Sequence, residues 1–446
     1  MTPGAQVAAT IEILHGIEDG ARPADDAAAD YFRRRRYIGA KDRPAIAGHV
    51  YEVLRHRAAL DWWIGRVTGN AVPGASRGRV LASLALIALW PPEKIARSCD
   101  GDRFHPAPLD RAEEKLVAGL AGHTLHHPAM PRAVRNDVPE WLLPSLERAL
   151  GPGLEGEIAA LNASAPVDLR VNSLKGDRET ARQRLATEGV AAAPTPFSPL
   201  GLRLKQRAPL SGLAAFREGL VEVQDEGSQL ATLLADARPG MRVVDFCAGA
   251  GGKTLALAAQ MHNRGKLVAL DVSDRRLERA GMRLRRAGVG NVERRALSGE
   301  RDPWVRHHKE SFDRVFVDAP CLGTGTWRRN PDAKWRMGPH DLDELVVRQQ
   351  DILQSAARLV RPGGRLVYAT CSLLCEEDED QVEAFLTSAP DFALLPAAEA
   401  WREPIGGTPP AGSGRTLRLS PARHGTDGFF VAIFARRECA ATAPAS

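Results

Sequence analysis

From residue 225 onward, short apolar runs alternate with amphipathic segments, and this alternation constrains the possible folds more than any other feature of the chain. RVVDFCA, KLVALDV, FDRVFVDAP and RLVYATCS are typical of buried strands, and the segments between them are typical of helices. Such alternation predicts an α/β domain with a doubly wound, mostly parallel sheet. DGFFVAIFARR (427–437) predicts a late strand, antiparallel at the end of the sheet.

The first part of the chain is expected to be helical. Over residues 1–130 apolar side chains recur at helical spacing, as at Ile46, Val50, Val53, Leu54 and Leu60. A Pro-rich stretch (126–144) then predicts a linker.

A small mixed segment follows the linker. Strand-like and helix-like runs over about 152–222 predict a small α+β module, in which one helix begins at the N-cap Asp177 and stops at Gly189. We therefore expect three domains, with boundaries at 1–135, 136–222 and 223–438.

Composition limits the classes of protein to which the chain can belong. Its 446 residues suffice for two or three domains. The chain contains no run of about 18 uncharged apolar residues, so we expect no membrane span. The start lacks a basic region followed by an apolar core, so we expect no secretory signal and a cytoplasmic protein. The six cysteines form neither a disulfide framework nor a zinc pattern, and we expect no metal site. The net charge of +5, clustered in arginine-rich runs, suits RNA as a partner.

A glycine-rich turn, DFCAGAGGKT (245–254), follows one strand and opens a helix. Glycines let a ligand approach the backbone, but the phosphate-binding pattern fails because Cys247 stands where it needs glycine. The dinucleotide-binding pattern GxGxxG fails because Thr254 stands where it needs its last glycine. A nucleoside-binding loop of another kind remains. Asp271 ends the next strand and is expected to accept both ribose hydroxyls, or else to cap the following helix.

Two cysteines end two other strands of the predicted sheet. Cys321 lies in DAPCLGTGT, three residues after Asp318, and Cys371 lies in YATCSLL. The carboxyl ends of parallel strands form the ligand crevice of such a sheet, so both thiols should point into one cleft. A buried free cysteine is more often a small apolar side chain, but two placed at separate strand ends favour covalent chemistry. We expect Cys375 and Cys247 to be structural.

The segment TWRRNPDAKWR (326–336) mixes cations with two tryptophans. Guanidinium groups can hold phosphates and indoles can stack on bases, so the segment favours RNA binding over an ordinary solvated loop. The residues expected to bind RNA here are Arg328, Arg329 and Lys334.

The residues from about 222 to 436 resemble the RsmB/NOL1/NOP2/Sun family of RNA cytosine-5 methyltransferases. The resemblance rests on QDEGSQL (224–230), DFCAGAGGKT, LDVS, DAPCLGTGT, RRNPDAKW, YATCS and HGTDGFF, in that order. It implies a Rossmann-like domain that uses S-adenosylmethionine. The run RVNSL resembles the family's small RNA-binding module, and residues 39–63 resemble, more loosely, the NusB-like helical domain of the branch that modifies ribosomal RNA.

The resemblance also implies a role for each site residue. Cys371 would attack C6 of the cytosine, Asp318 would hydrogen-bond its N3 side, and Cys321 would assist removal of the C5 proton and release. Arg170 and Asn172 would contact the RNA backbone. The cofactor would contact Asp318, Asp271 and the residues Cys247, Ala248, Gly249, Ala250, Gly251, Gly252 and Lys253.

One departure from the family pattern concerns the adenine. The family usually has an acidic residue near the adenine of the cofactor, after the third strand of the sheet. In this chain Ser298 stands in its place. A serine can still hydrogen-bond the adenine amine.

The expected function is methylation of ribosomal RNA, with 16S rRNA favoured, by a monomer. The alternatives are a non-catalytic RNA-binding assembly factor and a DNA cytosine-5 methyltransferase, since Pro320-Cys321 matches the nucleophile motif of the DNA enzymes. The second thiol and the RNA-like modules argue against a DNA substrate.

Overall fold

The computed structural model describes residues 1–446 except 21, 70–74, 403–404 and 439–446. Cys439 and the tail after it therefore lie outside the described residues. The chain divides into two compact units, and each contains segments that are distant in the sequence: 1–147, 151–163 and 327–339 form the first, and 148–150, 164–326 and 340–446 the second. In the described part of the chain no helix is long and apolar enough to span a membrane.

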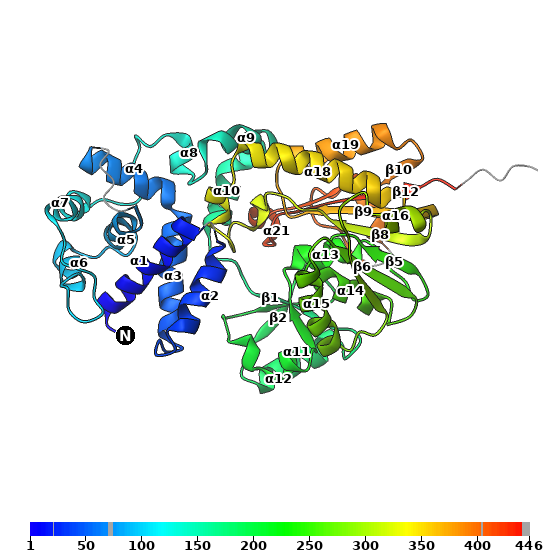
Figure 1. The fold of residues 1–446 in the computed structure, drawn as a ribbon, viewed down its shortest axis with the longest axis horizontal. Helices are drawn as coiled ribbons and strands as arrows, with labels where there is room; N and C mark the ends of the chain where they lie inside the picture. Colours follow the sequence, from blue (N-terminus) through cyan, green and yellow to red (C-terminus); the bar gives the residue numbers. More distant parts are fainter. Residues whose placement is uncertain (21, 70–74, 403–404, 439–446) are drawn as a thin grey trace, which may run out of the picture. The chain divides into compact units, whose positions relative to one another are not determined.

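The first unit is built from helices (Figure 1). The five apolar residues at helical spacing are all buried in its core, which confirms a helical N-terminal region. Its elements are α1 (Pro3–Gly20), α2 (Ala24–Arg34), α3 (Asp42–Arg55), α4 (Arg57–Thr68), α5 (Ala75–Leu86), α6 (Pro92–Ser98), α7 (Arg111–Leu120), α8 (Arg132–Arg135), η1 (Glu140–Leu142), most of α9 (Leu143–Leu150), η2 (Gly151–Gly153), α10 (Leu154–Asn162) and α17 (Ala333–Arg336).

The Pro-rich stretch 126–144 is not an open linker, which corrects the expectation. It contains α8, η1 and the start of α9, and the side chains of Met130, Val138 and Leu142 are buried. Prolines are tolerated at the first turn of a helix, so a Pro-rich run is compatible with several short helices.

The segment 327–339 leaves the second unit and packs into the first. The ammonium of Lys334 is buried and donates to the carbonyl oxygens of Asp137 (3.2 Å) and Arg55 (3.5 Å) and to the side chain of Asn162. The indole N–H of Trp335 donates to a backbone carbonyl of α3 at 2.7 Å. The segment is therefore part of the packed interior of the helical unit.

This burial corrects the expectation that Lys334 and Arg328 hold RNA phosphates. Their side chains are 2% and 5% exposed, so neither presents its charge to solvent. Burial lowers the pKa of Lys334 to about 8, and the ammonium therefore stays protonated at neutral pH. Arg329 is half-buried, and its expected RNA contact stays a prediction.

We expect the substitution Lys334→Ala to destabilise the protein by about 1–3 kcal/mol, because it leaves three buried oxygen acceptors without their donor. Urea unfolding followed by circular dichroism measures the change. The matched control is Lys115→Ala, since Lys115 is exposed on α7 and its loss should stay within about 0.5 kcal/mol. Equal effects of the two substitutions would contradict the structural role of Lys334.

The second unit begins with a small antiparallel sheet in the order β2-β3-β1-β4. Asp177 accepts a hydrogen bond from the backbone N–H of Thr180 at 2.7 Å, and Gly189 has a φ of +79°, which confirms the predicted cap and stop. The elements are β1 (Asp168–Val171), α11 (Arg178–Thr187), β2 (Ala192–Pro194), β3 (Gly201–Leu204), η3 (Leu210–Gly212), α12 (Ala214–Arg217) and β4 (Val221–Val223).

The predicted mostly parallel sheet follows, with strand order β10-β12-β9-β8-β5-β6-β7 and β11 beside β12. Helices cover both of its faces (Figure 1), over two buried apolar clusters. Its elements are α13 (Glu226–Leu233), β5 (Arg242–Asp245), α14 (Gly252–Gln260), β6 (Lys266–Asp271), α15 (Asp274–Ala287), β7 (Val292–Ala296), α16 (Pro303–His307), β8 (Phe312–Asp318), η4 (Thr324–Thr326), α18 (Pro339–Ala357), β9 (Val360–Thr370), η5 (Cys375–Glu377), α19 (Glu379–Ser388), β10 (Phe392–Leu395), α20 (Ala397–Ala400), β11 (Leu417–Leu419), α21 (Pro421–His424) and β12 (Phe429–Arg436).

The late strand β12 is antiparallel to β9, as predicted, but it does not lie at the end of the sheet. The unpredicted strand β10 pairs with its other edge, with Phe392 opposite Arg436. β12 is apolar over its first six residues and buried there, which suits an interior strand with both faces covered.

Candidate active site

A cavity of about 990 Å³ opens at the carboxyl ends of the central parallel strands. Nine of the ten residues expected to hold the cofactor line it, Gly251 being the exception, and both predicted catalytic cysteines line it as well. Its other lining residues are Gln224, Ser228, Phe246, Val272, Arg276, Arg283, Leu297, Gly299, Glu300, Ala319, Pro320, Arg348, Ile352.

The glycine-rich turn between β5 and α14 provides open backbone along this cavity. Gly249 and Gly251 have φ angles of +53° and +81°, which side chains rarely adopt. A Cβ at Gly251 would lie 2.8 Å from Ala280 Cβ, whereas nothing lies within 4 Å of one at Gly249. Gly251 therefore serves close packing, and Gly249 leaves space on the side of the cavity where a cofactor would bind.

Asp271, at the end of β6, orders both sides of the cavity. One carboxylate oxygen accepts the N–H of Gly249 and the other accepts the N–H of Ser273, each at 2.8 Å. Ser273, not Asp271, is the N-cap of α15, so the alternative that Asp271 caps this helix is wrong. Each oxygen retains a lone pair, which suits the expected contact with two ribose hydroxyls.

Ser298, which stands in place of the family's acidic residue, is paired with an acid nearby. Its hydroxyl and its backbone N–H both donate to Asp302, at 2.9 and 2.8 Å. The hydroxyl proton is thus used, and the oxygen is left as an acceptor for an amine such as the N6 group of adenine. The residues around the cavity therefore fit a nucleoside cofactor.

Asp318 and Lys253 form an ion pair at the centre of the cavity lining. The ammonium donates to the carboxylate at 2.6 Å, and the Lys253 side chain is 12% exposed. Burial alone would lower the pKa of Lys253, but the attraction of Asp318 and of Cys371 raises it. The lysine therefore stays charged beside Asp318 and Cys371, two of the three predicted catalytic residues.

The two thiols meet because their strands are neighbours. β8 and β9 are parallel, with Asp318 opposite Ala369, so the residues after both strands lie side by side. The Sγ atoms of Cys321 and Cys371 are 3.5 Å apart, within hydrogen-bond distance for sulfur. This hydrogen bond, together with burial, raises the pKa of Cys321 well above its usual value. Burial and the neighbouring sulfur therefore both favour the protonated thiol at Cys321.

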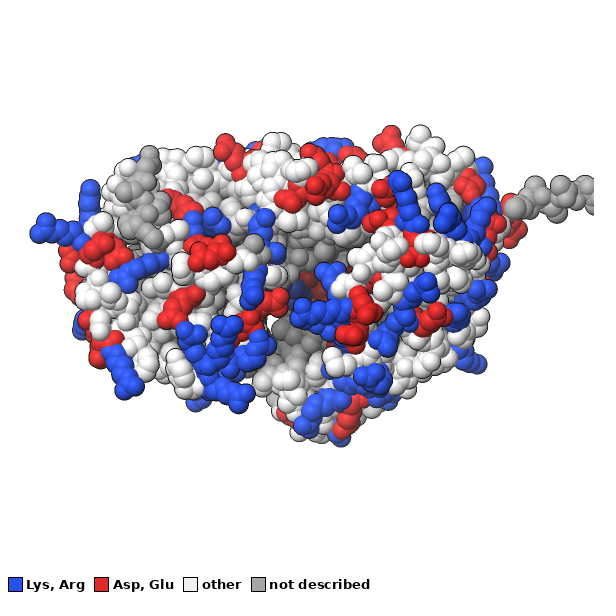
Figure 2. Space-filling model, in the orientation of Figure 1, with Lys and Arg blue, Asp and Glu red and all other residues white. Residues whose placement is uncertain are grey.

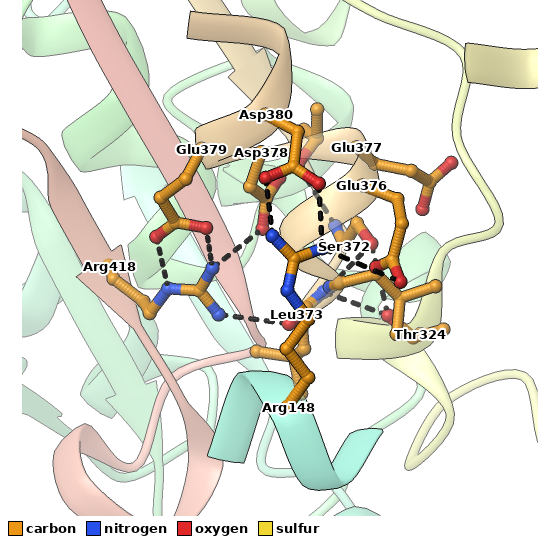
Figure 3. A network of polar contacts seen from close by, with 12 residues as sticks. Arg148, Thr324, Ser372, Leu373, Glu376, Glu377, Asp378, Glu379, Asp380 and Arg418 are labelled. Atoms are coloured by element: carbon orange, nitrogen blue, oxygen red, sulfur yellow. Dashed lines mark hydrogen bonds and ion pairs between the residues drawn. The ribbon is translucent and has the colours of Figure 1, made fainter. Parts of the chain in front are cut away.

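Hydrogen bonds also join the two loops that carry the thiols (Figure 3). The hydroxyl of Thr324, on the loop after Cys321, lies 3.2 Å from the hydroxyl of Ser372 and accepts the N–H of Leu373 at 2.8 Å. A change in one loop would therefore be transmitted to the other.

Glu377, for which the sequence analysis predicts no role, supports the same loops. Its carboxylate accepts the N–H of Leu322 at 2.9 Å and the side-chain amide of Gln349 at 3.1 Å. Burial raises its pKa. The signal available in the sequence was the acidic run Glu376–Asp380, which begins five residues after Cys371 and which the structure places partly in the interior.

The next residue, Asp378, fixes the end of β9. It accepts the hydroxyl of Thr370 at 2.6 Å and pairs with Arg418 at 3.3 Å, while Arg418 also donates to the carbonyl of Leu373 (Figure 3). The nucleophile candidate is thus flanked by hydrogen-bonded residues on both sides. Rigid support of this kind preserves the geometry of a reactive group.

Arg170 and Asn172 are not available to RNA, which corrects another expectation. Both side chains are buried. Arg170 donates to the side chain of Gln224 and to the carbonyl of Gly252 (2.9 Å), and Asn172 donates to the carbonyls of Gly219 and Ala287, each at 2.9 Å. They attach the small module to the larger domain beside the glycine-rich turn.

The remaining cysteines near the site are Cys247 and Cys375. Cys247 lines the cavity, and burial raises its pKa well above the usual value. Burial also raises the pKa of Cys375 to about 11. Burial thus favours the protonated form of both thiols, as it does for Cys321, and the structural role expected for Cys247 and Cys375 stays a prediction.

Comparison with known proteins gives consistent matches. The family model described as 16S rRNA methyltransferase RsmB/F matches residues 231–435, and that of the RsmF/B-like ferredoxin-like domain matches 138–211. The chain is 30% identical to ribosomal RNA small subunit methyltransferase B of Klebsiella pneumoniae, covering 90% of this chain and 91% of the relative.

Two further matches extend over almost the whole chain. A probable ribosomal RNA small subunit methyltransferase B of Synechocystis is 35% identical, covering 91% of this chain and 94% of the relative. The crystal structure of PH0851 superposes with a TM-score of 0.80 at 28% identity, covering 97% of this chain and 99% of that one. The similarity therefore includes the helical unit as well as the α/β domain.

Proposed function

The chain belongs to the RsmB/F family of S-adenosylmethionine-dependent methyltransferases, and from this premise we propose that it methylates C5 of a cytosine in ribosomal RNA, with 16S rRNA favoured. The observation that carries the proposal is the pair of thiols 3.5 Å apart in the cavity that also contains the cofactor residues. C5 of cytosine is a poor nucleophile until a group adds to C6, and a thiolate is suited to that addition.

Cys371 is the proposed nucleophile. Its sulfur, as the thiolate, bonds to C6, and the electron pair of the C5–C6 double bond becomes available at C5. Asp318 lines the same cavity and is proposed to hydrogen-bond the N3 side of the ring, where the negative charge that develops is met by a proton that Asp318 shares with the Lys253 ammonium. Lys253 holds the Asp318 carboxylate in position. S-adenosylmethionine, when bound, supplies the methyl group that C5 takes.

Cys321 is the proposed base for the second half of the reaction. After methylation C5 still carries its hydrogen, and the bond between Cys371 and C6 breaks only when that proton leaves. Once Cys321 has lost its own proton to solvent, its thiolate takes the C5 proton, the C5–C6 double bond re-forms and the Cys371 thiolate departs. A thiol with a raised pKa is a strong base when deprotonated, which suits this role.

Bisulfite sequencing of ribosomal RNA from a strain that lacks the protein tests the proposal. We expect one 5-methylcytosine to disappear, to return with the wild-type gene and to stay absent with a Cys371→Ala copy. If no position loses its methyl group, the cytosine product is wrong and the alternative of an RNA-binding assembly factor gains support. Methylation of duplex DNA and not of RNA by the purified protein would favour the alternative of a DNA cytosine-5 methyltransferase.

The helical unit and the small module are proposed to dock the substrate. The loose resemblance of residues 39–63 to a NusB-like domain supports this role for the helical unit. We propose that a monomer acts, and light scattering of the purified protein at micromolar concentration tests that assignment.

A further inference from the structure

We propose that the outer face of α15 is the surface on which the phosphate backbone of the substrate RNA lies as it approaches the cavity. The inference rests on the proposed function, which makes RNA the partner. The arrangement of the arginines gives the location of the surface. Eight of its fourteen residues are charged, six of them arginine, and they surround a narrow apolar face. The buried residues of the helix are Leu277, Ala280, Gly281, Leu284 and Ala287.

The arginines of α15 form a stripe along the exposed side of the helix. Arg275, Arg279 and Arg286 are spaced by four and seven residues, so they lie on one line, opposite the buried residues. Arg275 and Arg279 are exposed, and Arg286 is half-buried against Phe216. Fourteen residues extend about 20 Å, long enough for several phosphates of an RNA strand. Figure 2 shows Lys and Arg side chains gathered on the face over α15.

Several of these charges are not neutralised by carboxylates. No ion pair joins Arg275, Arg279 or Arg285 to an acid within the described residues, whereas Arg286 and Arg283 pair with Glu222 at 2.5 and 3.4 Å. An exposed guanidinium without a carboxylate partner is available for phosphate, which it binds in a bidentate geometry.

The stripe is continuous with the proposed active site. Arg276 and Arg283, on the flank of the same helix, line the cavity that contains the two thiols. At the other end of the helix, the exposed Lys175 of the small module donates to the carbonyl of Arg286 at 2.8 Å. A strand bound on α15 would therefore extend from the small module to the mouth of the cavity.

The other arginine run of the chain is a weaker candidate. In Arg33–Arg36 two of the four side chains are already paired, Arg33 with Asp30 and Arg35 with Glu12. That run also belongs to the helical unit, and none of its residues lines the catalytic cavity. The α15 stripe has both unpaired charge and continuity with the site.

The test compares two full-length double variants with equal changes in charge. Arg275→Glu/Arg279→Glu reverses the charge of the two exposed members of the stripe. Arg264→Glu/Lys309→Glu is the control, since these two exposed residues precede β6 and β8, at the amino ends of the parallel strands. Binding of unmodified 16S rRNA transcribed in vitro is measured against salt concentration, and binding of S-adenosylmethionine is measured by calorimetry.

We expect the stripe variant to bind RNA about tenfold or more weakly, with a slope of log K against log salt reduced by about one for each lost contact. Its KM for RNA should rise while kcat at saturating RNA and cofactor affinity stay unchanged. An RNA affinity equal to that of the control variant would overturn the proposal. If Arg275→Glu/Arg279→Glu does not fold, Arg275→Gln/Arg279→Gln gives the same comparison with a smaller expected loss.

Failure of this inference is distinguishable from failure of the proposed function. RNA binding is measured without reference to the atom that is methylated, and mass spectrometry of the digested product identifies the methylated nucleoside separately. Wild-type protein that makes 5-methylcytosine, combined with equal binding by stripe and control variants, would reject only the docking surface. Protein that binds RNA through the stripe but makes another product would reject only the reaction.

Discussion

The substitution Cys371→Ala is expected to lower the rate of methyl transfer by roughly 10⁴-fold or more, because it removes the group that adds to C6. The cavity and the loops around it should persist, since the Sγ atom contacts only the thiol of Cys321 among the hydrogen-bonding side chains described. Transfer of tritiated methyl groups from S-adenosylmethionine to unmodified 16S rRNA measures the rate, and calorimetry checks that cofactor binding is retained.

The chain offers a matched control for this experiment in Cys375. It is a free cysteine four residues further along, half-buried, with a pKa raised to about 11 by burial. Cys375→Ala should methylate within a few-fold of the wild-type rate. A Cys371→Ala protein that keeps full activity would show that the nucleophile is another group, with Cys321 the first to examine.

The positions of the two thiols could be predicted because they depend on a simple property of the sheet. Parallel strands end at one edge, so a residue directly after a strand is placed by the strand alone. Asp271 and Asp318 end their strands in the same way, and both line the cavity. The alternation of strands and helices that identified this sheet is a local pattern, readable from one sequence.

The RNA contacts expected for Lys334 and Arg170 were wrong because the burial of these residues depends on the tertiary fold and not on a local pattern. Their surroundings are formed by residues far along the chain: Lys334 meets the carbonyls of Arg55 and Asp137, and Arg170 meets that of Gly252. A charged residue in a polar run is exposed on average, but buried carbonyl oxygens can compensate its burial. The sequence around either residue therefore does not distinguish an exposed charge from a buried charge with carbonyl partners.

The bracing by Glu377 was missed because its partners are also distant. Leu322 and Gln349 lie 55 and 28 residues away in the sequence, and the acidic run that contains Glu377 is typical of a solvated helix start. Strand β10 was missed because Phe392–Leu395 is short and has one exposed residue. Its pairing with β12 depends on the whole sheet, not on its own four residues.

The substitution Cys321→Ala is expected to produce a different defect, a stable covalent complex between protein and RNA. Cys371 remains able to add to C6, and C5 remains able to accept the methyl group. Without the base at Cys321 the C5 proton is removed slowly, so the bond between sulfur and C6 persists. Turnover should fall by roughly 10²–10⁴-fold, the usual contribution of a positioned base, while the first half of the reaction continues.

Denaturing gel electrophoresis with labelled 16S rRNA makes this outcome visible. We expect a slowly migrating band that appears with Cys321→Ala, depends on S-adenosylmethionine and disappears after ribonuclease treatment. The double variant Cys321→Ala/Cys371→Ala is the control, and it should give no band because the proposed nucleophile is gone as well. A band in the double variant would assign the bond to another residue. No band in the single variant, together with normal turnover, would mean that release does not need Cys321, although its thiol lies 3.5 Å from that of Cys371.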